Sequence, residues 1–158
     1  MTVLLLKLRF FVLGCFGSQD LSGARAQVIR EALDTVLREL LDRHAPAGVD
    51  LNSAAAAHVA IKANTTHCGP IARRIEQLLR QKGVRGIQFH SLLGHYLIRD
   101  AITGLLYDLE CYGGVRDKEA LPLYRRASGN TDRAAVDGWL VQRRVAFAGL
   151  VTPGANAQ

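Results

Sequence analysis

Apolar residues recur with helical spacing over two long segments of the chain. They return every three or four positions over 24–44 and again over 68–82, where Pro70 suits a first helical turn and Gly83 suits the exit. A shorter, alanine-rich stretch over 54–63 is also typical of a helix. The pattern therefore predicts that the first half of the chain is mainly helical.

The pattern changes after Gly86, where apolar and polar residues begin to alternate. Alternation is typical of strands with one buried face. The expected elements are strands over 87–89, 95–100 and 105–111, the last of them ended by Gly113 and Gly114, then a loop containing Pro122 and a helix over 132–147. Helices first and strands later predict an α+β fold, in which a small antiparallel sheet packs on the helices.

The two ends of the chain carry weaker patterns. Even-numbered residues over 4–12 are apolar while Lys7 and Arg9 are charged, which favours a half-buried strand over a signal peptide. We expect residues 1–151 to form a single domain and residues 152–158 to form a flexible tail.

Composition and charge narrow the class of protein. The 158 residues are 49% hydrophobic and 22% charged, which is an ordinary globular balance. No run reaches the roughly 18 apolar residues that a membrane-spanning helix needs. The net charge is +6, but basic and acidic residues are interleaved and no aromatic platform accompanies them. This favours solvated helix faces over a nucleic-acid surface. Since the sequence shows no convincing signal peptide, we expect a protein of the cytoplasm, or one delivered from a cytoplasmic pool.

Three cysteines, Cys15, Cys68 and Cys111, give an odd count without a CxxC pair. Such usage is typical of a reducing compartment and argues against a disulfide framework. Cys68 differs from the other two because it opens the predicted helix over 68–82. Unpaired backbone N–H groups and the helix dipole at that position stabilise a thiolate, which is the nucleophilic form of cysteine.

A thiolate nucleophile needs a base held beside it, and the last two predicted strands supply one. If the turn between them has an even number of residues, Leu97 pairs with Asp108. His95 then pairs with Glu110, and these side chains share one face of the sheet. Asp108 lies diagonally across from His95, with roughly 7–8 Å between the Cα atoms, which is within side-chain reach. A carboxylate there would orient the imidazole and leave its other nitrogen for Cys68.

Two short motifs surround these residues: Cys-Gly-Pro-Ile-Ala at 68–72, and Gly-His-Tyr-Leu-Ile at 94–98 followed by Tyr-Asp at 107–108. Together they resemble the papain-like cysteine peptidase superfamily, most closely its bacteriocin-processing, double-glycine type. Transglutaminase-like proteins and arylamine N-acetyltransferases use a similar order. The resemblance covers residues 64–114.

That resemblance implies a papain-like fold and a thiol protease or related hydrolase. Its catalytic triad would be Cys68, His95 and Asp108. The substrate would be a peptide or protein, cleaved at an amide or isopeptide bond through a thioester, and the chemistry needs no cofactor and no metal.

Two positions depart from the resemblance. Papain-like peptidases usually carry a glutamine six residues before the cysteine, where it helps to bind the oxyanion, and this chain has Lys62 there. Asn64 is the nearby amide and is our candidate for that role, beside the backbone N–H of Cys68. The double-glycine type usually has an acidic residue before the cysteine, and here that residue is His67.

Other interpretations of the same residues stay open. His90 is a second candidate base. Zinc ligand types are present at His67, Cys68, His90, His95 and Cys111, although no pair has finger-like spacing. We interpret Asp132, Asp137 and Trp139 on the last helix as capping and packing residues. The alternative function is a non-catalytic binding module on the same fold, with a basic surface that recruits nucleic acid or an acidic protein.

Overall fold

The computed structural model describes residues 18–126 and 133–148 of the chain. The first half is helical, with α1 (Ser18–His44), α2 (Ala54–Thr66) and α3 (Cys68–Gln81). The strands β1 (Ile87–Leu92), β2 (His95–Asp100), β3 (Leu106–Asp108) and β4 (Cys111–Val115) follow, and then the short helices η1 (Lys118–Ala120) and α4 (Pro122–Arg125) and the last helix α5 (Arg133–Ala148). The predicted α+β class is confirmed. The expected strand over 4–12, Cys15, Asp132 and the tail over 152–158 lie outside the described residues.

The four strands form one antiparallel sheet in the order β1-β2-β3-β4. Between β2 and β3, Ile98 pairs with Tyr107 and Arg99 pairs with Leu106. This is the register that an even-membered turn predicts, so it confirms the expected placement of Asp108 on the His95 face of the hairpin.

The prediction of one strand over 105–111 is wrong. β3 stops at Asp108, and Leu109 and Glu110 form a tight turn into β4, where Asp108 pairs with Cys111. Gly113 and Gly114 lie inside β4 rather than after a strand. The turn contains no Gly or Pro. A side chain stabilises it instead, since Asp108 Oδ1 accepts a hydrogen bond from the backbone N–H of Glu110 at 2.8 Å.

Two helix boundaries and one unexpected helix also differ from the prediction. α1 begins at Ser18, before the predicted start at 24. α2 continues to Thr66, into the predicted break over 64–67, and the hydroxyls of Thr65 and Thr66 bond to carbonyls one turn earlier in the same helix. The predicted loop around Pro122 contains α4, in which Pro122 is the first residue.

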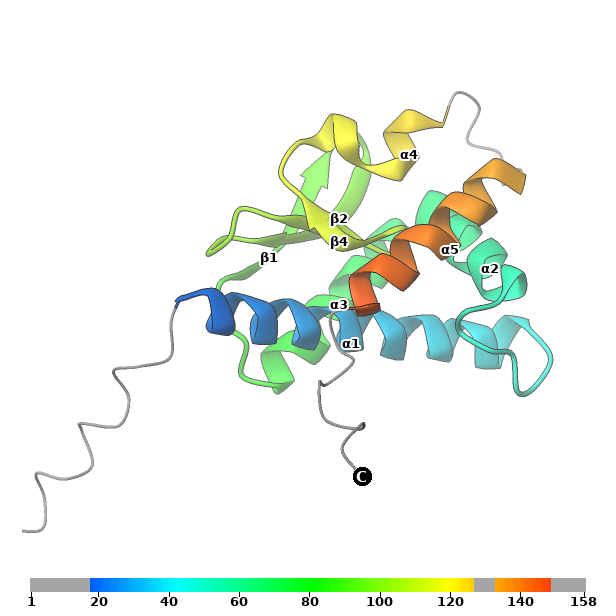
Figure 1. Ribbon diagram of the computed structural model, residues 1–158, viewed down its shortest axis with the longest axis horizontal. Helices are drawn as coiled ribbons and strands as arrows, with labels where there is room; N and C mark the ends of the chain where they lie inside the picture. The colour runs from blue at the N-terminus through cyan, green and yellow to red at the C-terminus, as the bar shows by residue number, and fades with distance from the viewer. Residues whose placement is uncertain (1–17, 127–132, 149–158) are drawn as a thin grey trace, which may run out of the picture.

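The sheet and the helices share one main apolar core. Ile71, Ala72, Ile75 and Leu79 give α3 a buried stripe that packs on β1 and β2 on one side and on α1 on the other. Burying such side chains contributes about 1.5–3 kcal/mol each for the larger ones. In Figure 1, α1 runs along the lower side of the molecule, with the sheet above its N-terminal half and α2 above its C-terminal end.

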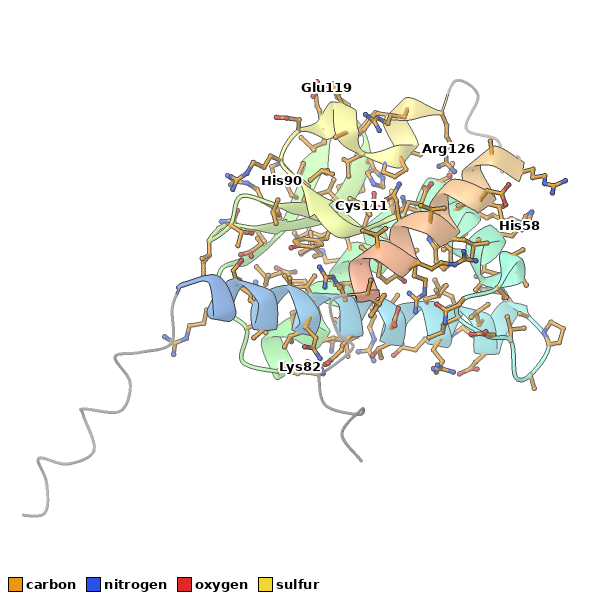
Figure 2. The ribbon with its side chains drawn as sticks, viewed as in Figure 1. His58, Lys82, His90, Cys111, Glu119 and Arg126 are labelled. Carbon is orange, nitrogen blue, oxygen red and sulfur yellow. The ribbon has the colours of Figure 1, made fainter. Side chains whose placement is uncertain are left out.

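Charged pairs fix how α1 meets the rest of the molecule. Arg25 makes a bidentate contact with the buried carboxylate of Asp100, at 2.7 and 2.8 Å, and so fastens α1 to the end of β2. Lys82 lies on the α1 side of the molecule (Figure 2), with its Nζ 3.4 Å from Glu31.

Among the described residues, no helix combines the length and apolar character needed to cross a bilayer.

Candidate active site

His95 and Asp108 form the buried centre of the site. His95 opens β2 and Asp108 closes β3, and the hairpin register places them diagonally, with His95 Nε2 2.9 Å from Asp108 Oδ2. Their residues are only 4% and 2% exposed, so water does not compete for this contact. Because the backbone N–H of Glu110 holds the other oxygen of Asp108, the carboxylate has a fixed orientation.

Cys68 lies on the other side of the imidazole. Burial lowers the pKa of His95, but hydrogen bonds with Asp108 and Cys68 and the charges of both groups outweigh it, so the pKa is raised above its usual value. Since Nε2 contacts Asp108, Nδ1 is the ring nitrogen that remains for the thiol. Cys68 itself is partly exposed. The structure thus brings the three predicted residues together in the order thiol, imidazole, carboxylate.

The start of α3 leaves backbone donors free beside the sulfur. His67 occupies the N-cap position, and its side chain makes no capping hydrogen bond within the described residues. The first intrahelical bond runs from the N–H of Ile71 to the carbonyl of His67 at 3.2 Å. Pro70 has no N–H. The backbone N–H groups of the first turn that have no partner within the helix are therefore those of Cys68 and Gly69.

Tyr124 of α4 covers the imidazole. Its ring meets the His95 ring edge-on, with 6.3 Å between centroids and an interplanar angle of 83°. Its hydroxyl donates to the carbonyl of Leu92 at 2.5 Å, which holds the ring over the site. Burial, followed by the charges of Asp108 and Cys68, raises the pKa of Tyr124. Sequence reasoning missed this residue, because Tyr124 lies in a segment that was expected to be a loop.

The turn after Asp108 is held by side chains from three other parts of the chain: α5, α2 and the residue that follows α4. Trp139 of α5 donates its indole N–H to the carbonyl of Leu109 at 2.8 Å. The Asn64 amide and Arg126 both donate to Glu110 Oε2, at 2.9 and 2.7 Å. The expectation that Trp139 is a packing residue is therefore incomplete, since its N–H also holds the turn beside Asp108.

Asn64 and Glu110 have contacts that the sequence did not predict. Asn64 is 1% exposed, its amide nitrogen donates to Glu110, and its Oδ1 has no hydrogen-bond partner within the described residues. The structure thus ties the candidate oxyanion residue to the β3–β4 turn. Glu110 lies in that turn and not on a strand opposite His95. Burial raises its pKa to about 7, and the Asp108 carboxylate adds to this rise, although the Asn64 hydrogen bond and the charges of Arg126 and His95 oppose it.

An aromatic wall borders the first turn of α3. The Tyr96 ring lies against Gly69, where an added Cβ would meet it at 3.4 Å. Phe89 stacks on Tyr96 with 5.1 Å between centroids, and the Arg73 guanidinium lies 3.9 Å from the centre of the Phe89 ring. Leu93, which is 80% exposed, occupies the turn before His95 with a φ of 47°, a strained conformation for a bulky residue.

The remaining candidates lie away from this centre or have other contacts. Lys62 and His67 are exposed, and His67 Nδ1 contacts the Thr66 hydroxyl at 2.6 Å. His90 lies on β1 opposite Leu97. Burial raises the pKa of the Cys111 thiol to about 12. Within the described residues, no group of three or more His, Cys, Asp or Glu side chains is arranged to hold a metal ion.

Comparisons with protein-family models, with curated proteins and with solved structures find no match for this chain. The chemistry of the site is therefore argued from its own geometry.

Proposed function

We propose that this protein is a papain-like thiol hydrolase or acyltransferase that cleaves an amide or isopeptide bond of a peptide or protein. One observation carries the proposal: the buried pair of His95 and Asp108, with 2.9 Å between Nε2 and Oδ2, lies near the open start of α3, where Cys68 helps to raise the pKa of His95. The order of these groups is that of a nucleophile, its base and the group that orients the base.

The reaction follows from that order. Nδ1 of His95 takes the thiol proton, and the sulfur of Cys68 attacks the substrate carbonyl carbon. The N–H groups of Cys68 and Gly69 donate to the oxygen on which negative charge develops. When the tetrahedral intermediate collapses, the C–N bond breaks and His95 returns its proton to the leaving amine. A thioester remains on Cys68.

Water or another acceptor then attacks the thioester with His95 as the base, which releases the acyl group and restores the thiol. Asp108 stabilises the imidazolium that forms in both steps, and it holds the imidazole with Nδ1 toward the sulfur. Tyr124 packs edge-on against His95, and the buried setting of the His95–Asp108 contact strengthens it.

Trapping of the acyl-enzyme tests this proposal. Incubation with a p-nitrophenyl ester should add one acyl group to the protein, seen by intact mass and mapped by peptide analysis to Cys68. The Cys68→Ala variant should acquire none, and the His95→Gln variant should acquire it at least a hundredfold more slowly. Acylation at Cys111, or equal rates in all three proteins, would instead support the alternative of a non-catalytic binding module with a basic surface.

A further inference from the structure

A groove of about 630 Å³ lies between α1, α2 and α3. Its size is that of a small-molecule site rather than a packing defect. Val36, Leu40, Val59, Ala63 and Ile71 give it an aliphatic floor, and no aromatic residue lines it among those that the structure describes. The part that α1 lines, from Val36 to His44, is about 12 Å long at 1.5 Å per residue.

The rim of the groove is basic. Arg43, His44, Lys62, His67 and Arg74 line it together with one acidic residue, Glu39. Arg74 binds that carboxylate through two nitrogens, at 2.7 and 3.1 Å, so its charge is balanced. Within the described residues, Arg43 and Lys62 have no ion-pair partner. Arg43 does act on Glu39 at longer range, since its charge helps to lower the pKa of that carboxyl. The groove therefore presents an excess of positive charge beside an aliphatic surface.

The unpaired charges lie toward one end of the groove. The ion pairs Glu39–Arg74 and Glu31–Lys82 show that α1 and α3 run antiparallel, since the residue number falls along α1 as it rises along α3. The last turn of α1, with Arg43, thus lies beside the first turn of α3, while the Glu39–Arg74 pair lies farther along. A ligand that fits this arrangement has an extended aliphatic part and one anionic end.

We propose that the groove binds an aliphatic carboxylate, with its alkyl chain on the floor and its carboxylate between Arg43 and Lys62. Charge complementarity selects this ligand: an uncharged alkyl chain would leave both cations unpaired, and a cationic amphiphile would meet two like charges. The proposal does not depend on catalysis by Cys68, because Cys68 is not among the residues that line the groove.

Calorimetric titration of the full-length Cys68→Ala variant with decanoate tests the proposal, because this background cannot form an acyl-enzyme. Decanoate below its micelle concentration should bind saturably at one site and shift the amide resonances of Leu40 and Val59. Decyltrimethylammonium and acetate should each bind at least tenfold more weakly, because the first has the wrong charge and the second has no chain.

Paired variants locate the charge effect. Arg43→Gln with Lys62→Gln should weaken decanoate binding at least tenfold, about 1.4 kcal/mol. The control, Arg38→Gln with Arg144→Gln, removes two exposed charges that do not line the groove and should leave the affinity unchanged. Arg43 lies in the last turn of α1, where a basic residue also complements the helix dipole. The control pair shows whether the loss of affinity comes from these two positions or from a lower net charge alone. The proposal would be overturned if decanoate showed no saturable binding, or if decyltrimethylammonium bound as tightly as decanoate. It would also be overturned if both pairs of variants weakened binding equally, or if only an acidic peptide bound to the groove.

Discussion

The substitution Asp108→Asn tests the proposed triad most sharply, because the structure fixes which way the new amide must face. The backbone N–H of Glu110 needs an acceptor at the position of Oδ1, so the amide oxygen takes that place and the NH₂ group faces His95. A donor there forces Nε2 to accept, and the imidazole proton moves to Nδ1. His95 then cannot take the thiol proton of Cys68.

The size of the effect follows from the contact that is lost. A hydrogen bond to a charged group contributes about 1.5–3 kcal/mol, and each 1.4 kcal/mol is a factor of ten. Alkylation of Cys68 by iodoacetamide at pH 7 should therefore slow by about 10- to 100-fold. Turnover of an acyl substrate should fall by about 10⁴-fold, because the imidazolium also loses its counter-charge.

The assay follows the mass of the intact protein over time and maps the modified cysteine, with circular dichroism to confirm folding. In the wild type Cys68 should react fast, while the buried Cys111 should not. Glu110→Gln is the matched control, because it changes a neighbouring carboxylate and keeps the backbone N–H that holds Asp108; its effect on alkylation should be much milder. A folded Asp108→Asn variant that alkylates at the wild-type rate would refute the reasoning.

Three further predictions concern the surroundings of the site. Because burial raises the pKa of Glu110 to about 7, the folded state keeps a proton that the unfolded chain releases near pH 4.5. The free energy of unfolding should thus fall as pH rises from about 5 to 8, and urea titrations of Glu110→Gln should show a flatter profile; an unchanged slope would contradict this. Trp139→Phe leaves the carbonyl of Leu109 without its donor and should cost about 1–3 kcal/mol in urea unfolding, so a loss near zero would count against the role of this bond. Leu93→Gly should raise stability by about 0.5–1 kcal/mol, since it relieves a positive φ at an exposed residue, and a lower melting temperature would contradict it.

The sequence by itself determined the features that depend on short stretches of chain. The apolar stripe over 68–82 specifies α3 and places Cys68 at its start, because helical periodicity is a local property. The contact between His95 and Asp108 was also predictable, since strand alternation and an even-membered turn fix which residues of a hairpin share a face. The position of Cys68 at a helix start and the pairing of His95 with Asp108 were therefore each predictable without long-range information. The approach of Cys68 to that pair depends on how α3 packs on the sheet.

Only the tertiary structure decided what holds those residues in place. The turn at Leu109 and Glu110 carries no Gly or Pro, and it is stabilised by Trp139 and Asn64, which lie 30 and 46 residues away in the chain. Tyr124 reaches the site because its hydroxyl bonds to Leu92, on another element. Such contacts depend on how helices and sheet pack in three dimensions, and no local pattern encodes them. The same holds for the groove between α1, α2 and α3, because three segments that are separate in the sequence meet there only after the core has formed.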